Sequence, residues 1–326
     1  MEQQTFSHSV GIDVGKRELV ACVRCSQSGI TEPPAAFPNS SIGFRKIIVY
    51  LEKYNVGNDV PILFESTGPY HWQAARTLAD KGFFVKVANP IHTKQIARLS
   101  IRKRKTDKVD AANLAFLASQ NYGYQFVETE EMVKKKALIR HYWKLRMTAT
   151  NLLCHERYLK NYRNISVASV SKSIVKRCEI IKKQIIKEWS KGNDVKYLDS
   201  IPGITPFLAA TILSELLPLS RFQKMDQIVA YAGLDPSVKQ TGGKPGRHGA
   251  ISKRGSATLR EALWLAAFGS FQRQPTRTLY LRYKERGMHH NTILCILGRK
   301  ILRISVALLK KRRVFDPKFM SVDKSD

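Results

Sequence analysis

The sequence has no long apolar run and few cysteines. No stretch reaches the roughly 20 apolar residues that a membrane-spanning helix needs, and the first residues show no basic segment followed by an apolar one, as a signal peptide would. The five cysteines include one C-x-x-C pair, Cys22 and Cys25, without a second Cys or His pair at zinc-finger spacing. These absences argue against a membrane protein, a disulfide scaffold and a zinc finger, so we expect a cytoplasmic protein with reduced thiols.

Acidic residues are also scarce. The 326 residues include 26 Asp and Glu against 55 Lys and Arg, a formal net charge of +29 at pH 7. Such an excess favours a polyanionic partner, of which nucleic acid is the commonest. Residues 1–125 hold 16 basic and 10 acidic residues and the remainder holds 39 and 16, so their net charges are +6 and +23. We therefore expect most of the nucleic-acid-binding surface in the C-terminal two thirds of the chain.

Strand and helix patterns alternate through the first third of the chain. Residues 9–25 predict two strands joined by a tight turn, because apolar alternation stops at Gly15 and Lys16 and then resumes. Four further elements are expected in alternating order: a helix at 42–54, a strand at 61–64, a helix at 70–79 and a strand at 83–88. This alternation predicts an α/β domain.

Two acids interrupt or end the apolar strands of this region. Asp13 lies in the middle of the first strand, and Glu65 lies at the C-terminal end of a later one. A carboxylate inside an apolar strand is costly to bury unless it binds something, and sites in open α/β sheets gather near strand ends. Each acid also has an ordinary explanation, because Asp13 can pair with Lys16 or Arg17 and Glu65 can cap a turn.

A second acidic pair follows a basic run. If a helix begins near Thr106, Asp107 and Asp110 are three residues apart on one face of it. Carboxylates so close repel each other unless a cation lies between them, and Mg²⁺ prefers oxygen ligands; the alternative is a solvated helix N-terminus. Four cations before the pair would attract phosphate to the same place: Arg102, Lys103, Arg104 and Lys105. All four acids together, in a basic chain, favour a metal site over separate structural roles.

The middle of the chain predicts two long helices between residues 128 and 189. Leu138, Leu145, Leu152 and Leu159 recur every seven residues in the first, and the second carries the seam Val170, Ile174, Cys178, Ile181 and Ile185. A short break separates them. This pattern favours an antiparallel coiled coil that serves as a dimerisation hairpin or spacer.

The C-terminal part begins with a segment, 198–216, that resembles a helix-hairpin-helix, whose backbone N–H groups contact DNA phosphates. Thr205 stands where a second glycine is usual, so a simple turn between two helices explains it equally well. A loop rich in glycine follows, up to residue 256, with cations suited to nucleic acid: Lys244, Arg247, His248, Lys253 and Arg254. Apolar helices are expected at 257–271 and 292–311.

Two serines lie at the end of this loop. Ser256 is the natural N-cap of the next helix, whereas Ser252, one turn earlier, has no capping role that we can assign. Flanked by Lys253 and Arg254 ahead of a helix N-terminus, Ser252 is well placed to meet a phosphate. The alternatives are a phosphate contact without chemistry and an ordinary loop serine.

Seven motifs, in order along nearly the whole chain, resemble those of the DEDD transposases of insertion sequences, a family that includes bridge-RNA-guided recombinases and pilin-gene invertases. Four lie in the first half: Gly-Ile-Asp-Val at 11–14, Phe-Glu-Ser-Thr-Gly at 64–68, Asn-Pro at 89–90 and Lys-Thr-Asp-Lys-Val-Asp-Ala at 105–111. Three lie in the second: Ile-Pro-Gly-Ile at 201–204, Ala-Gly-Leu-Asp-Pro at 232–236 and Ile-Ser-Lys-Arg-Gly at 251–255.

The resemblance implies an α/β RuvC-like (ribonuclease-H-like) domain, a helical coiled-coil middle and a mainly α-helical transposase domain. The boundaries would be 1–126, 127–195 and 196–319, with a disordered tail at 320–326. It implies that Asp13, Glu65, Asp107 and Asp110 bind Mg²⁺ and that Ser252 is the nucleophile. Family members work as dimers and tetramers, in which the serine of one subunit meets the carboxylates of another. Many use a guide (bridge) RNA to choose the donor and target DNA. They act in the bacterial cytoplasm, at the nucleoid.

These observations predict a DNA recombinase that forms a phosphoserine bond, which retains the energy needed for religation. One alternative is a RuvC-like metal nuclease, such as a junction resolvase, in which water attacks. A second is an actin-fold sugar kinase, because residues 12–16 resemble the phosphate loop of that fold. The net charge of +29 and the lack of a second Asp-x-Gly loop argue against this alternative. A third is a nucleic-acid-binding protein with structural acids. Transposition and inversion both stay open.

Overall fold

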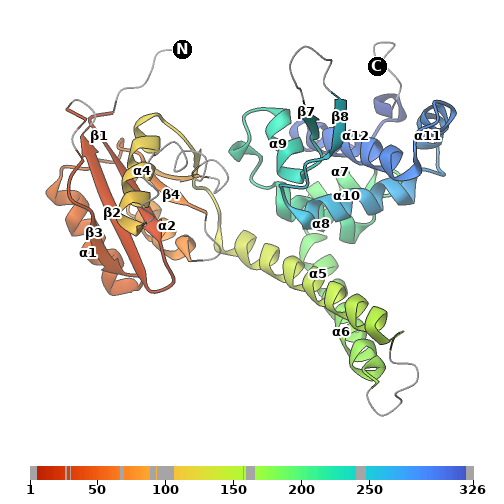
Figure 1. The fold of residues 1–326 in the computed structure, drawn as a ribbon, viewed down its shortest axis with the longest axis horizontal. Coiled ribbons are helices and arrows are strands. Elements are labelled where there is room, and N and C mark those ends of the chain that lie inside the picture. The colour runs from red at the N-terminus through yellow and green to blue at the C-terminus, as the bar shows by residue number, and fades with distance from the viewer. Residues whose placement is uncertain are drawn as a thin grey trace. The chain divides into compact units, whose positions relative to one another are not determined.

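A computed structural model describes residues 6–25, 28–29, 31–66, 70–88, 93, 106–156, 158, 166–239 and 247–320 (Figure 1). The chain divides into two compact units, Met1–Val127 and Glu128–Asp326. Each unit is built around apolar side chains of its own. Within the described residues, no helix is long and apolar enough to cross a membrane. The tail predicted to be disordered lies outside them from residue 321 onward.

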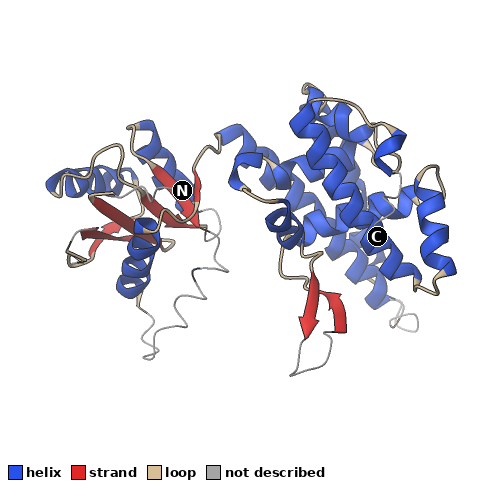
Figure 2. Cartoon of the chain, turned by 90° about the horizontal axis from the view of Figure 1, so that it is seen from above, coloured by secondary structure: helices blue, strands red, loops and turns tan. Residues whose placement is uncertain are grey.

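The first unit is a mixed sheet with helices on its faces (Figure 2), which confirms the predicted combination of sheet and helices. The strand order is β3-β2-β1-β4-β5-β6, in which β1 pairs antiparallel with β2 and parallel with β4. The strands are β1 His8–Val14, β2 Glu18–Cys25, β3 Ala35–Pro38, β4 Ile62–Glu65, β5 Val85–Ala88 and β6 Tyr124–Gln125. The helices are α1 Ser41–Lys53, α2 His71–Asp80 and α4 Asp107–Ser119.

Residues of β1 alternate between the two faces of the sheet, as the period of a strand requires. Val10, Ile12 and Val14 are buried in the core that α1 and α2 cover. Ser9 and Gly11 face the other way, toward α4. The strand is therefore apolar on one face and carries small residues on the other, so that a helix can approach closely.

Two long helices open the second unit. α5 Glu130–Glu156 and α6 Ala168–Trp189 pack against each other as an antiparallel hairpin (Figure 1). The hydroxyl of Ser171 donates to the carbonyl of Ala149 at 3.0 Å, which ties the two helices together near the closed end of the hairpin. Cys178, Ile181 and Ile185 of the predicted seam are buried.

The rest of the predicted seam is confirmed only in part, because Leu138, Leu145 and Ile174 pack against the core but are partly buried. The buried residues of α5 are Ile139, Tyr142, Trp143 and Ala149, and the leucines at 138, 145 and 152 are only half-buried. Val170 is 52% exposed, and residue 159 lies outside the described residues. The reason is a third helix: Tyr142 lies against Phe207, with 4.6 Å between ring centroids, so this face of α5 turns toward α8 as well as α6.

The remainder of the second unit is helical around one apolar core. Its helices are α7 Asn193–Asp199, α8 Pro206–Leu216, α9 Met225–Ala232, α10 Ala257–Ser270, α11 Thr276–Glu285 and α12 His290–Lys311. The predicted helices that begin after Ser256 and near Thr292 are confirmed as α10 and α12. Gly203, between α7 and α8, has φ +91° and faces α10, where a Cβ would lie 2.4 Å from the carbonyl oxygen of Ala266. This glycine therefore permits close helix packing.

One expectation for this unit is wrong. The glycine-rich segment before Ser256 is not only a loop, because β7 Pro236–Lys239 and β8 Arg247–Ile251 pair as an antiparallel hairpin. Its sequence lacks the apolar alternation that marks a half-buried strand, so backbone hydrogen bonds form the ladder without that signal. Helix α11 and strands β3 and β6 also lacked a prediction, since all three are short or polar.

Candidate active site

The four predicted acids lie at the same edge of the first unit. Asp13 is the second-last residue of β1, and Glu65 is the last residue of β4. These strands are parallel neighbours in which Ile12 pairs with Phe64, so Asp13 and Glu65 each follow the same pair. The register alone places the two carboxylates on adjacent strands at one level of the sheet.

The packing of α4 on β1 brings in the other two acids. The hydroxyl of Ser9 donates to the carbonyl of Ala115 at 2.9 Å, and a Cβ on Gly11 would lie 2.2 Å from the carbonyl oxygen of Ala111. Helix α4 thus runs antiparallel to β1. Two strand residues span about 7 Å and one helical turn about 5 Å, so the first turn of α4 lies beside Asp13. That turn carries Asp107 and Asp110 and follows the N-cap Thr106, whose hydroxyl accepts the N–H of Val109 at 3.3 Å.

The charges that act on Asp13 also indicate that the four acids lie close together. Burial, together with the negative charges of Asp110, Asp107 and Glu65, raises the pKa of Asp13 to about 6, although a hydrogen bond from the Val14 N–H lowers it. Lys16 and Arg17, the ordinary partners considered for Asp13, are exposed, and within the described residues neither forms an ion pair with it. The other three acids therefore act on Asp13 as like charges.

Glu65 has one further partner, because the hydroxyl of Thr93 donates to its Oε2 at 2.9 Å. No group of three or more His, Cys, Asp or Glu side chains in the described part of the chain stands arranged to hold a metal ion. The donor chemistry nevertheless fits a hard divalent cation: four carboxylates offer only oxygen, and their mutual repulsion is what such a cation would relieve.

Several predicted nucleic-acid-binding residues lie outside the described residues: Arg102, Lys103, Arg104, Lys105 and Lys244. The side chains of Arg247 and His248 do so as well, although their backbone forms β8. Lys253 and Arg254 are described and exposed.

Ser252 follows β8 directly and is held by the segment between α9 and β7. Its N–H donates to the carbonyl of Asp235 at 2.9 Å, and the next residue, Lys253, donates its N–H to Gly233 at 3.2 Å. The Ser252 hydroxyl donates to Oδ1 of Asp235 at 2.5 Å and accepts the N–H of Arg254 at 3.4 Å. Ser252 is therefore fixed in backbone and side chain, and it is half-buried.

Close packing holds the rest of this loop. A Cβ on Gly255 would lie 1.9 Å from the carbonyl oxygen of Tyr231, which also accepts the N–H of Ser256 at 2.6 Å. Arg260 donates to the carbonyl of Ala232 at 3.2 Å. The Ser256 hydroxyl accepts the N–H of the third residue of α10, which confirms Ser256 as the predicted cap.

Cations gather beside the Ser252 loop. Burial raises the pKa of the Cys295 thiol on α12, and the positive charges of Arg299, Lys253 and Arg260 act in the opposite direction. Because all three charges act on this thiol, each of these side chains lies near it. The buried Nε of Arg299 has no hydrogen-bond partner among the described residues. Of this group, only Lys253 was predicted from the sequence to bind nucleic acid, and no role was predicted for Asp235 although the Ala-Gly-Leu-Asp-Pro motif contains it.

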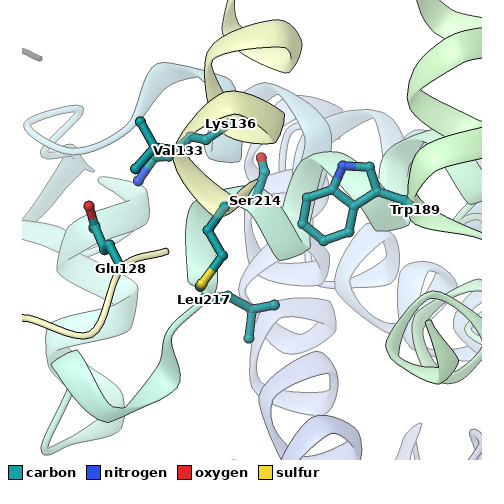
Figure 3. Close-up of a pocket in the computed structure, with 7 residues that line it drawn as sticks. Glu128, Val133, Lys136, Trp189, Ser214 and Leu217 are labelled. Carbon is teal, nitrogen blue, oxygen red and sulfur yellow. The ribbon is translucent and has the colours of Figure 1, made fainter. Parts of the chain in front are cut away.

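A small cavity elsewhere in the second unit takes no part in either cluster. It lies between the start of α5, the end of α6 and the end of α8 (Figure 3), with about 20 Å³ of space. That volume holds about one water molecule. Its lining residues are Glu128, Met132, Val133, Lys136, Trp189, Ser214 and Leu217.

The comparisons with known proteins agree with the motifs. Residues 10–159 match a transposase model of the DEDD, IS110 type, and residues 195–282 match the transposase IS116/IS110/IS902 family model. A pilin gene-inverting protein of Moraxella bovis is 26% identical over 315 residues, covering 94% of this chain and 97% of that protein. An uncharacterized 43.6 kDa protein of insertion element IS110 from Streptomyces coelicolor is 32% identical over 115 residues, covering 35% of this chain and 28% of that protein.

Among solved structures, the chain matches T. thermophilus RuvC in complex with Holliday junction substrate. The TM-score is 0.29 and the identity 12%, over 37% of this chain and all of that one. The two family models lie in order along the chain, and the first spans the four acids while the second spans Ser252. The chain belongs to the IS110/IS116/IS902 family of transposases, whose relatives include pilin gene-inverting proteins.

Proposed function

We propose that this chain is a DNA recombinase that cuts and rejoins DNA strands through a covalent bond to Ser252, with Mg²⁺ at its four acids. The observation that carries the proposal is the convergence on Asp13 of the charges of Asp110, Asp107 and Glu65. Acids from two strands and a helix gather at one sheet edge in a chain of net charge +29. Five of the six strands support a RuvC-like (ribonuclease-H-like) first domain, because neighbouring strands among β3, β2 and β1 are antiparallel and β4 and β5 then run parallel to β1.

In this proposal Asp13, Glu65, Asp107 and Asp110 hold the metal. When bound, Mg²⁺ supplies charge stabilisation to the scissile phosphate and its attacking and leaving oxygens. The chain positions the carboxylates: β1 and β4 fix Asp13 and Glu65, and the Gly11 contact fixes the first turn of α4. Thr93 orients the Glu65 carboxylate through its hydroxyl.

Ser252 is proposed as the nucleophile because its hydroxyl is held in one orientation beside cations. Its oxygen attacks phosphorus, and the phosphoserine bond that forms keeps the energy of the broken phosphodiester for religation. Lys253 and Arg254 bind the phosphate as charge-assisted donors. Both side chains are exposed next to Ser252, as this role requires.

The choice of DNA is proposed to involve a guide (bridge) RNA, bound by the C-terminal two thirds of the chain, which carries a net charge of +23. The chain is proposed to act as a homodimer or homotetramer. Its rearrangement is site-specific strand exchange, which insertion of an element and inversion of a segment share. Recovery of a discrete RNA with the purified protein, and loss of strand exchange after ribonuclease treatment, are the expected results.

The decisive test is a suicide DNA substrate whose cleaved strand cannot be religated. Wild type should accumulate a protein–DNA adduct with Mg²⁺, and Ser252→Ala should accumulate none. Ser256→Ala is the matched control: it removes a helix cap worth about 1 kcal/mol but should still form the adduct. Cleavage without any adduct would instead favour the runner-up function, a RuvC-like nuclease that uses water.

A further inference from the structure

The second unit contains a serine–carboxylate pair that the fold itself sets up. Asp235 immediately precedes β7 and Ser252 immediately follows β8. The last pair of that hairpin is Pro236 with Ile251, so Asp235 and Ser252 flank it directly. The antiparallel pairing therefore places the two side chains opposite each other, independently of the residues at the tip of the hairpin.

Backbone contacts fix the distance between the two side chains. The Ser252 N–H donates to the Asp235 carbonyl at 2.9 Å, and the Lys253 N–H donates to the Gly233 carbonyl at 3.2 Å. Gly233 has φ +65°, and a Cβ there would lie 2.6 Å from Nη1 of Arg260. Since both ends of the pair are anchored, the 2.5 Å contact between Ser252 Oγ and Asp235 Oδ1 belongs to the framework and is not a chance rotamer.

The hydrogen bonds of Ser252 leave one lone pair for an electrophile. A serine hydroxyl has one hydrogen and two lone pairs. The hydrogen points to Asp235, and one lone pair accepts the N–H of Arg254 at 3.4 Å. Within the described residues, Asp235 forms no ion pair that would compete for its charge. The pair thus has the arrangement of a nucleophile with a base in reach.

We propose that Asp235 is a catalytic residue that takes the proton of Ser252 as its hydroxyl attacks the DNA phosphate. This inference rests on the proposed function of Ser252. In the step, the Ser252 O–H bond breaks and its proton passes to the Asp235 carboxylate, while the bond from Oγ to phosphorus forms. The bond from phosphorus to the leaving deoxyribose oxygen breaks; that oxygen departs with the electron pair and takes a proton from water.

A carboxylate so near a phosphate needs compensation, and the neighbouring cations provide it. Lys253, Arg260 and Arg299 all act on the Cys295 thiol beside this loop, and the buried Arg299 Nε is without a partner among the described residues. Their charges offset the repulsion between Asp235 and the incoming phosphate. The chain thus separates two tasks, holding the phosphate and removing the proton, on different side chains.

The test compares rates of adduct formation on the suicide DNA substrate for full-length variants. Asp235→Asn keeps an oxygen that accepts the Ser252 hydrogen bond but cannot take the proton, so its rate should fall by about 100-fold or more. The rate of Asp235→Ala should fall as far, and the rate of Asp235→Glu, which keeps the carboxylate, should fall less than either. Asp226→Asn, which removes an exposed acid from α9, should keep the wild-type rate.

The pH profile provides a readout that a purely structural role would not move. The residual rate of Asp235→Asn should rise about tenfold per pH unit, because hydroxide must replace the lost base, and the wild type should not follow that slope. A near-wild-type rate for Asp235→Asn with a low rate for Asp235→Ala would overturn the inference, since Asp235 would then only orient the hydroxyl. So would an Asp235→Glu rate no higher than that of Asp235→Asn.

The outcomes for Ser252 and Asp235 are separable. Thermal unfolding shows whether each variant still folds. If Asp235→Asn does not fold, the rate of Asp235→Glu decides whether Asp235 acts as the base. Suppose that wild type forms the adduct, Ser252→Ala forms none, and Asp235→Asn forms it at the wild-type rate. This result would overturn only the role of Asp235. Absence of any adduct in wild type would overturn the serine chemistry and the base together.

Discussion

Glu215 on α8 is a fully buried acid, and its neighbours decide its ionisation. Burial alone would raise its pKa, but the hydrogen bonds of Arg140 and the charges of Lys136 and Arg140 outweigh it and lower the pKa to about 2. Arg140 donates to both carboxylate oxygens, at 2.7 and 3.0 Å, and the Tyr231 hydroxyl donates at 2.7 Å. The carboxylate therefore joins α5, α8 and α9, the helix that leads into the segment holding Ser252.

The ion pair between Glu215 and Arg140 predicts that the protein loses stability in acid. The folded pKa of Glu215 lies below its ordinary value of 4.5, so its contribution is complete above about pH 4.5 and disappears as the pH falls toward 2. The shift corresponds to roughly 3 kcal/mol. Glu215→Gln should lose about 3 kcal/mol at pH 7 and flatten the pH dependence in this window, as urea unfolding measures. Glu285→Gln, at an exposed acid, should keep the wild-type profile; an unchanged profile for Glu215→Gln would contradict the prediction.

The acids of the first unit predict metal-dependent stability. Because the charges of three acids raise the pKa of Asp13, a divalent cation should stabilise the fold by relieving their repulsion. Mn²⁺ or Mg²⁺ should raise the melting temperature of the wild type, and chelation should reverse it. Asp13→Asn and Asp107→Asn should lose this shift. Retention of the full shift in both variants would place the cation elsewhere.

At the scale of elements, the contact between β1 and α4 brings the acids of the candidate site together. Gly11 is the residue that permits it, because any Cβ there meets the backbone of α4, 2.2 Å from both the Ala111 oxygen and the Ala115 nitrogen. Helix backbone cannot move aside as a flexible side chain can. The position of Asp107 and Asp110 beside Asp13 therefore depends on a residue that carries no chemistry.

Gly11→Ala is predicted to displace α4 and to separate its acids from Asp13. We expect destabilisation of about 1–3 kcal/mol, the usual cost of overpacking a core, and a loss of metal-induced stabilisation larger than the change in folding explains. Thermal unfolding with and without Mn²⁺ measures both. The matched control is Gly192→Ala, where the nearest atom to an added Cβ is the Trp189 oxygen at 3.8 Å; wild-type behaviour of Gly11→Ala would show that α4 is not held in this way.

At the scale of the whole molecule, the net charge of +29 predicts how the chain should bind nucleic acid. A chain with 55 Lys and Arg against 26 Asp and Glu should bind DNA without sequence preference and with strong salt dependence. If six to ten phosphates are contacted, affinity should fall by about 10³–10⁵ between 50 and 200 mM salt. Fluorescence anisotropy over this range measures the slope, and a flat response would argue against a binding surface made mainly of phosphate contacts.

Assembly can be tested by mixing two inactive variants. If Ser252 of one subunit acts with the carboxylates of another, Ser252→Ala and Asp107→Asn should each be inactive alone and regain part of the activity when mixed. The adduct assay measures this, because only the Asp107→Asn subunit can carry the DNA. Failure to regain any activity, with mixed multimers confirmed, would contradict an active site shared between subunits.

The sequence by itself determined the family, the combination of sheet and helices in the first unit, and most helix limits. N-caps such as Thr106 and Ser256 mark the start of a helix locally, since each hydroxyl accepts a hydrogen bond from the N–H three residues later. The alternation of β1 and the periodicity of α12 are likewise local properties of the chain. Net charge is a sum over residues and needs no fold at all.

Only the tertiary structure decided which residues lie together. The leucine repeat of α5 suggested a two-helix seam, but α8 packs on the same helix and turns Tyr142 and Trp143 inward. The β7–β8 hairpin, built from backbone hydrogen bonds in a polar segment, brings Asp235 to Ser252 across 17 positions of sequence. Such contacts depend on long-range register and close packing, which no local pattern of side chains encodes.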